Sequence, residues 1–180
     1  MGKPETARDW ERTSQIASDL KTLRSTIKGS RRVLSLVAIM SGKIETREFL
    51  IDDYGAVVEL WKRVEGLEIA EGDDREGVAQ FLARNSELSR VATDGSTIVG
   101  AVLCGHDGRR GHIYHLAVDP KYQGIGLGKR LVDECLDGLG RAGIQRAIIL
   151  VAHDNLQGRE FWKRCGWEEI PGAMVMGKDV

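Results

Sequence analysis

The fold is decided by the stretch Ile113-Tyr-His-Leu-Ala-Val-Asp-Pro-Lys-Tyr-Gln-Gly-Ile-Gly-Leu-Gly-Lys-Arg-Leu-Val132. Its apolar first part, residues 113–118, predicts a buried strand, and Pro120 ends that strand because proline cannot donate a ladder hydrogen bond. Apolar residues then recur at helical spacing from Leu131 to Leu139, which predicts a helix that begins at the glycines. The free N–H groups in the first turn of a helix favour an anion. The junction is therefore a candidate phosphate site.

A glycine-rich turn between a strand and a helix has more than one explanation. It is typical of a Rossmann dinucleotide site, and it also occurs as a tight turn that binds nothing. A Rossmann domain requires strands that alternate with helices. Here the pair Asp94-Gly95 predicts a β-hairpin between strands at 88–93 and 97–104, directly before the strand at 113–118. This order of elements argues against a dinucleotide site.

Composition narrows the class of protein further. The chain has 180 residues, of which 42% are hydrophobic, and this suits one domain with an appendage. A formal net charge of -1 gives no reason to expect a nucleic-acid partner. The three cysteines are widely spaced, so we expect neither disulfides nor a metal site, and we expect reduced thiols in a cytoplasmic protein. No apolar run approaches the ~20 residues of a membrane span.

Two motifs resemble the GCN5-related N-acetyltransferase (GNAT) superfamily, and within it a small bacterial acetyltransferase subgroup. The first is Gln123-Gly-Ile-Gly-Leu-Gly128, and the second is Asn155-Leu-Gln-Gly-Arg-Glu-Phe-Trp-Lys-Arg-Cys-Gly-Trp167. They occur in the order and at the separation found in that family. The resemblance runs from about Ile44 to the end of the chain. It implies an α/β (α+β) GNAT fold, in which helices flank a mixed, mostly antiparallel central sheet.

The chain is therefore expected to have two parts: an N-terminal helical extension at residues 1–40 and a GNAT domain at residues 41–180. The extension carries one narrow apolar stripe, which would pack on its own domain or on a second copy. Within the domain we expect helices that begin near Asp52, Asp73, Gly126 and Asn155. The expected strands lie at 44–50, 88–93, 97–104, 112–118, 147–151, 167–170 and 173–177.

The resemblance also implies a function. It implies an N-acetyltransferase that uses acetyl-CoA as cosubstrate, requires no metal, and lets a primary amine attack the thioester directly in a ternary complex. The acceptor is a small-molecule amine or a protein amine. The alternative is a CoA-binding regulatory module that does not catalyse transfer. No nucleic-acid or membrane partner is expected, and a homodimer remains an open alternative.

Family positions suggest which residues bind CoA. The backbone amides of the first motif would hold the pyrophosphate, and the side chain of Lys129 would add positive charge. The amides belong to Gln123, Gly124, Ile125, Gly126, Leu127 and Gly128. The pantetheine arm would insert between two splayed parallel strands, 113–118 and 147–151. Backbone groups of Leu116, Ala117 and Val118 would pair with it, and one N–H would bind the oxyanion. Asn155 matches a residue that contacts CoA, and it is equally a candidate helix N-cap.

Catalysis requires a base, because an ammonium acceptor has a pKa near ~10. Strict strand alternation places His112, Tyr114, Leu116 and Val118 on one face and His115 on the other. In the family the base lies on the central strand beside the donor, so the resemblance implies that His112 or Tyr114 serves the acceptor side and that His115 is structural. Trp162 stands where the family usually has a tyrosine acid, and an indole N–H is not a useful acid. The acidic loop 68–74 borders the acceptor in the family, although solvated carboxylates that cap a helix explain it better.

Overall fold

The sheet at the centre of the protein has five strands. The structure is a computed structural model that describes residues 44–178, so the predicted extension at 1–40 lies outside the described residues. The strands are β1 (Ile44–Glu48), β2 (Arg90–Asp94), β3 (Thr97–His106), β4 (Gly111–Val118) and β5 (Ala147–Ile149). The α-helices are α3 (Tyr54–Trp61), α4 (Arg75–Arg84), α5 (Leu127–Arg141) and α6 (Leu156–Arg164). Two short 3-10 turns, Ile51–Asp53 and Pro120–Tyr122, complete the elements.

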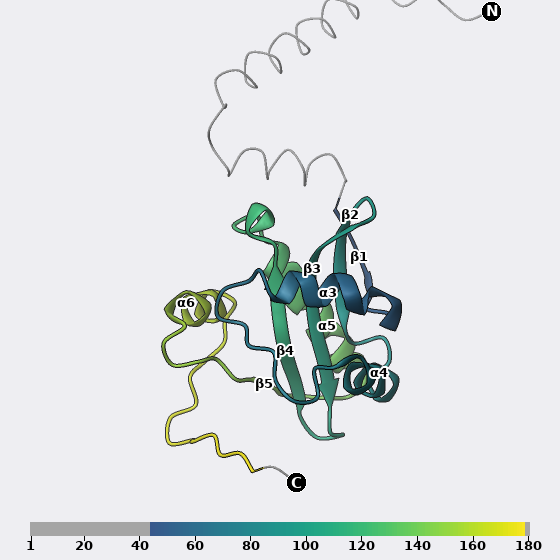
Figure 1. Ribbon diagram of the computed structural model, residues 1–180. Coiled ribbons are helices and arrows are strands. Elements are labelled where there is room, and N and C mark those ends of the chain that lie inside the picture. The colour runs from purple at the N-terminus through teal and green to yellow at the C-terminus, as the bar shows by residue number, and fades with distance from the viewer. Residues whose placement is uncertain (1–43, 179–180) are drawn as a thin grey trace, which may run out of the picture.

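The strands follow one another across the sheet in the order β1-β2-β3-β4-β5 (Figure 1). The first three pairs are antiparallel, and β4 and β5 are parallel. The predicted hairpin at Asp94-Gly95 joins β2 to β3, with Gly95 at a φ of +59°. The mixed, mostly antiparallel sheet expected from the sequence is therefore confirmed.

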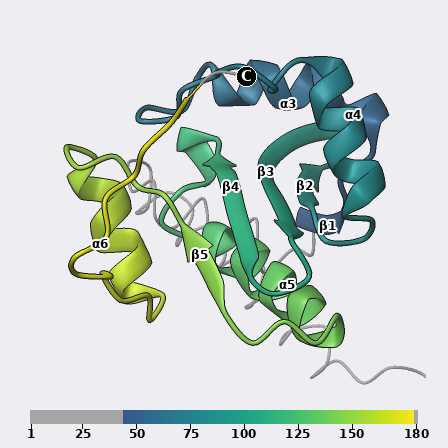
Figure 2. The ribbon, with the colours of Figure 1, turned by 90° about the horizontal axis from the view of Figure 1, so that it is seen from below.

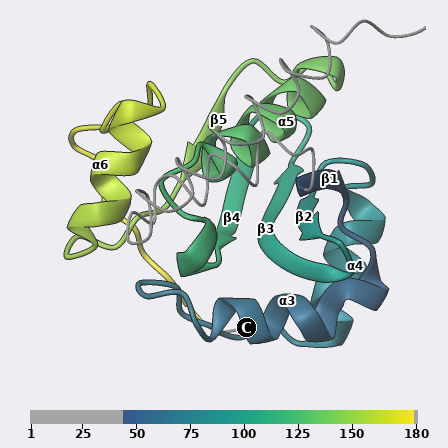
Figure 3. The ribbon, with the colours of Figure 1, turned by 90° about the horizontal axis from the view of Figure 1, so that it is seen from above.

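Helices cover both faces of the sheet. α3 and α4 lie on one face and α5 lies on the other, while α6 lies beyond the β5 edge (Figures 2 and 3). Each face has its own buried core. Trp61 and Leu60 of α3 belong to the core on the first face, and Leu131 and Cys135 of α5 belong to the core on the second. No helix among residues 44–178 is both long and apolar enough to cross a membrane.

The helix starts agree closely with their sequence signals. Asp74 caps α4, where its carboxylate accepts hydrogen bonds from the amides of Glu76 and Gly77. The long helix α5 begins directly after Gly126, whose φ of +87° turns the chain out of the loop and into the first helical turn. These two helices depend on local capping chemistry, which explains why the sequence located them well.

The predicted strands at 167–170 and 173–177 are wrong, because neither segment joins the sheet. Glu169 forms ion pairs with Arg159 at 2.7 Å and with Lys163 at 3.1 Å. These contacts keep the chain beside α6 after that helix ends. Residues 173–178 are exposed, including the side chains of Met174 and Met176.

A polar cluster at Glu134 attaches α5 to the two strands at the far edge of the sheet. Its carboxylate accepts from Thr46 of β1 at 2.6 Å, from Arg90 of β2 at 2.9 Å and from Arg130 at 3.1 Å. Partial burial by itself would raise the pKa of Glu134, but the three hydrogen bonds outweigh burial and lower the pKa below its usual value.

We expect Glu134→Gln to destabilise the protein at pH 7 by about 1 kcal/mol. The loss is modest because the ion pairs of Glu134 with Arg90 and Arg130 are partly exposed to solvent. A lowered folded-state pKa means that the carboxylate stabilises the fold above the unfolded pKa of ~4.3. That stability is lost as the pH falls through the folded pKa. Urea unfolding at pH 7 and below pH 4 should therefore show a difference from wild type that shrinks in acid. Asp137→Asn, which changes an exposed carboxylate on the same helix, is the control. If the free energy of unfolding of Glu134→Gln differs from that of wild type by the same amount at both pH values, the account is contradicted.

Candidate functional site

The candidate site lies where β4 loses its neighbour. β4 and β5 pair at three positions only, the last of which is Ile113 opposite Ile149. β4 continues five residues further to Val118 and stays paired with β3 on its other side. Along residues 114–118 the edge of β4 that faces β5 therefore has no strand partner among residues 44–178 (Figure 1). Such an edge presents unpaired N–H and C=O groups that an extended ligand can bind.

A β-bulge interrupts β4 inside this unpaired stretch. Ala117 pairs with Ala101 of β3, and Tyr114 pairs with Leu103, so two residues of β4 stand opposite one residue of β3. His115 takes up the extra length with a φ of +51°, in the left-handed region. A bulge shifts the alternation of side chains by one position, and it re-aims the side chains that follow.

The bulge overturns the predicted arrangement of faces on β4. Leu116 and Val118 pack with the α5 core, on the opposite face from Tyr114, which contacts Phe81 of α4. His115 lies on the α3 and α4 face, with its ring edge-to-face against Trp61 at a centroid distance of 4.7 Å. The predictions that His115 points away from Tyr114, and that Leu116 and Val118 share the face of Tyr114, are therefore wrong. Strict alternation fails here because a bulge leaves no signal in the hydrophobic pattern.

His115 pairs with an acidic side chain that the sequence had placed in a surface loop. Nε2 of His115 lies 2.8 Å from Oδ2 of Asp73, and the two side chains are 19% and 15% exposed. Asp73 is itself held, because the same oxygen accepts from the amide of Ala70 at 2.8 Å. The hydroxyl of Tyr54 donates to the backbone oxygen of Asp73 at 2.9 Å. The sequence predicted a structural role for His115, and it did not single out Asp73 within the acidic loop 68–74.

The predicted catalytic residues His112 and Tyr114 lie on the α4 side of β4, where they contact each other and Tyr114 contacts Phe81. Their rings stack at a centroid distance of 5.8 Å and an angle of 9°, and Phe81 meets Tyr114 edge-to-face at 6.0 Å. Burial raises the pKa of Tyr114. A phenol with a raised pKa stays protonated at neutral pH, so Tyr114 can donate a hydrogen bond there but cannot take up a proton.

The glycine-rich loop enters α5 next to the end of β4. Gly124 and Gly126 have φ values of +75° and +87°, and no heavy atom lies within 4 Å of where a Cβ would stand. This open space suits the close approach of a ligand to the backbone. The side chain of Gln123 donates to the backbone oxygen of Val118 at 2.9 Å and ties the loop to β4. Lys129 pairs with Asp133 on the helix surface at 2.6 Å.

The second motif places Asn155 and Trp162 in structural surroundings. Asn155 caps α6, where its oxygen accepts from the amide of Gly158 at 2.7 Å. A Cβ on Gly66 of the α3–α4 loop would stand 2.7 Å from Nδ2 of Asn155, so the two segments touch here. The ring of Trp162 packs against Trp167 at a centroid distance of 5.1 Å. Both residues therefore have a packing role, whatever they contact in a complex.

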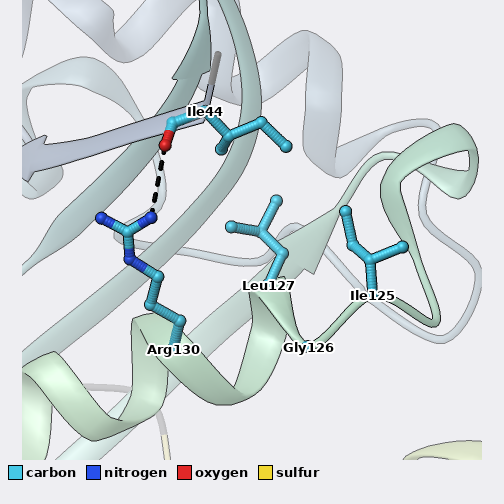
Figure 4. Close-up of a pocket in the computed structure, with 5 residues that line it drawn as sticks. All are labelled: Ile44, Ile125, Gly126, Leu127 and Arg130. Atoms are coloured by element: carbon cyan, nitrogen blue, oxygen red, sulfur yellow. Dashed lines mark hydrogen bonds between the residues drawn. The ribbon is translucent and has the colours of Figure 1, made fainter. Parts of the chain in front are cut away.

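A hollow of about 220 Å³ lies between the glycine-rich loop and the start of β1 (Figure 4). It is lined by Ile44, Ile125, Gly126, Leu127 and Arg130. The Arg130 guanidinium donates to the backbone oxygen of Ile44 at 3.3 Å and to the Thr46 hydroxyl at 2.7 Å. Arg130 therefore attaches the first turn of α5 to β1, at the sheet edge opposite β5.

Comparisons with known sequences all indicate the same family. The sequence profile described as the acetyltransferase (GNAT) family matches residues 54–167. An acetyltransferase of Sodalis glossinidius is 28% identical over 135 residues, which are 75% of this chain and 94% of that protein. An acetyltransferase of Pectobacterium atrosepticum is 33% identical over 135 residues, with the same coverage of both chains.

Solved structures agree with this match at the level of the fold. An acetyltransferase from Streptococcus agalactiae superposes with a TM-score of 0.63 and 15% identity, over 77% of this chain and 91% of that one. The PaiA N-acetyltransferase of Thermoplasma acidophilum, solved in complex with coenzyme A, gives a TM-score of 0.60 and 20% identity, over 67% and 87%. At these identities the likeness shows a shared fold.

The cap at Asn155 can be tested apart from any ligand. We expect Asn155→Ala to lower the free energy of unfolding by about 1 kcal/mol, because the amide of Gly158 loses its acceptor. Asn155→Asp is the matched control, since aspartate caps equally well and should keep stability near that of wild type. Urea unfolding of the three proteins measures both effects. Equal stability of wild type and Asn155→Ala would show that the cap contributes nothing.

Proposed function

The chain belongs to the acetyltransferase (GNAT) family, as its motifs predicted, and on this premise we propose that it transfers the acetyl group of acetyl-CoA to a primary amine. The amine attacks the thioester directly, while donor and acceptor are bound together. The observation that carries the proposal is the partnerless edge of β4 at residues 114–118, directly followed by a glycine-rich start of α5. An extended arm that ends in a phosphate group matches this combination of features.

Different residues of the site bind the pyrophosphate and the pantetheine arm of acetyl-CoA. The pyrophosphate of CoA binds the amides of the loop from Gly124 and of the first turn of α5, where the helix dipole favours negative charge. The backbone of Leu116, Ala117 and Val118 pairs with the amides of the pantetheine arm. Asn155, at the start of α6, contacts the same arm. Support comes from the open space at Gly124 and Gly126 and from the missing strand partner of β4.

In the chemical step, the main task of the protein is to hold the amine nitrogen next to the thioester carbon. The amine nitrogen forms a bond to the thioester carbon, the C–S bond breaks, and CoA leaves as a thiolate while the amine gives up a proton. A backbone N–H of β4 stabilises the oxyanion, a contribution that is typically worth 10²–10³ in kcat. A thiol pKa of ~8.5 makes the thiolate a good leaving group. A general acid is therefore dispensable, in keeping with tryptophan at position 162.

The first test is binding. Acetyl-CoA at 100 times its dissociation constant should stabilise the protein by about 2.7 kcal/mol and raise the melting temperature by several degrees. NAD, which also carries a pyrophosphate, should give no shift. Gly124→Asp should abolish the shift with acetyl-CoA, because a carboxylate would stand where the phosphates bind.

The control for Gly124→Asp is Gly172→Asp in the exposed tail. Gly172 has nearly the same backbone conformation, with a φ of +79°, and its Cβ position is equally open. Both variants therefore carry the same backbone strain and the same added charge. Full acetyl-CoA binding by Gly124→Asp, or equal loss in both variants, would contradict the phosphate site.

The second test is turnover. We expect the protein with acetyl-CoA to release free thiol only when a primary amine is present, and mass spectrometry should find the amine 42 Da heavier, the mass of one acetyl group added in place of a proton. The panel comprises a polyamine, free amino acids, and peptides with an N-terminal amine or a lysine. Acetyl-CoA binding without transfer to any member would contradict the proposed function and favour a non-catalytic CoA-binding module.

A further inference from the structure

His115 occupies a strained position that the surrounding structure maintains. Among residues 44–178, His115 and Glu87 are the non-glycine residues with a positive φ, and His115 alone of the two lies within a strand. A left-handed conformation is unfavourable for a residue that carries a side chain. It persists here because the ring is fixed on two sides, by Trp61 and by Asp73. Strain of this kind concentrates at functional sites, so the position calls for a functional explanation.

Contacts of the ring leave one nitrogen available. Asp73 accepts a hydrogen bond best from a protonated Nε2, so the neutral ring keeps its proton on Nε2 and a lone pair on Nδ1. Within residues 44–178, Nδ1 of His115 has no hydrogen-bond partner, whereas Asp73 is fixed by the amide of Ala70. A carboxylate, an oriented imidazole and an unoccupied lone pair together make a general base.

Location distinguishes His115 from His112, the base expected from the sequence. His112 lies where β4 still pairs with β5, opposite Ile148, and its ring is stacked on Tyr114. His115 lies two positions past the last pair, in the stretch that the acyl donor is proposed to occupy. A base must reach the amine that attacks the thioester, so the residue in the unpaired stretch is better placed.

Resting on the proposed function, we infer that His115 is the catalytic base of the acetyl transfer and that Asp73 is its positioning residue. As the N–C bond forms and the C–S bond breaks, the amine proton moves to Nδ1 of His115. The resulting imidazolium is stabilised by the Asp73 carboxylate, and CoA leaves as the thiolate. The proton then passes to solvent or to the departing thiolate, so the step needs no further reagent.

The test compares two matched variants in the turnover assay. His115→Asn removes the base with a residue that tolerates the left-handed conformation, and His112→Asn makes the same change three residues earlier. We expect His115→Asn to lower kcat by 10²–10⁴-fold with the acetyl-CoA thermal shift unchanged, and His112→Asn to lower it by less than about tenfold. Equal activity of His115→Asn and wild type, or the larger loss in His112→Asn, overturns the inference while the proposed function stands.

Two further variants separate a chemical role from a structural one. His115→Gly relieves the left-handed strain and leaves room for a small base, so added imidazole should restore at least a tenfold gain in turnover. Asp73→Asn should lower kcat but leave the KM for acetyl-CoA unchanged. In the dependence of kcat/KM on pH, Asp73→Asn should keep the fall toward acid pH, and His115→Asn should lose it. No imidazole rescue together with an unchanged pH profile in His115→Asn would show that His115 only supports the fold. A wild type that binds acetyl-CoA but acetylates no amine contradicts the proposed function and this inference together.

Discussion

The bulge in β4 determines what the rest of the site can do. One extra residue between Tyr114 and Ala117 turns His115 onto the α3 and α4 face and leaves Leu116 to pack against α5. Without the bulge the histidine would face the α5 core, and Asp73 would have no partner on the sheet. The residue that absorbs the bulge is held in a left-handed conformation by contacts from α3 and from the loop that follows it. The helices on that face therefore stabilise the bulge, and the bulge in turn positions the histidine.

A second constraint is the short pairing of β4 with β5. Three residue pairs hold the two parallel strands together, and beyond Ile113 this edge of β4 has no strand partner in the part of the chain that the structure describes. In most sheets such an edge is a liability, because it invites pairing with other chains. Here it is followed at once by the start of α5, so groups that bind an extended chain and groups that bind an anion lie next to each other. In the function that we propose, CoA binding and amine activation share this one strand: its backbone binds CoA, and the side chain of His115 activates the amine.

Local signals allowed much of this fold to be predicted. The order of elements from residue 44 to α6, the hairpin at Asp94-Gly95 and the entry to α5 all follow from turn chemistry and hydrophobic period, which act over a few residues. The bulge was missed because it is a property of two strands in register, and the sequence of one strand does not record it. The contact between His115 and Asp73 joins residues 42 apart and was missed for the same reason. The tail after α6 was predicted as two strands, yet ion pairs of Glu169 hold its start beside the helix.

The central claim is that the free edge of β4 binds the acyl carrier, and a crystal structure of the protein with acetyl-CoA tests it most directly. The account predicts that the pantetheine arm hydrogen-bonds to the backbone of β4 between residues 114 and 118, with the pyrophosphate on the amides that follow Gln123. It also predicts that the thioester lies within reach of His115. Acetyl-CoA bound elsewhere, or a β4 edge left empty in the complex, would contradict it.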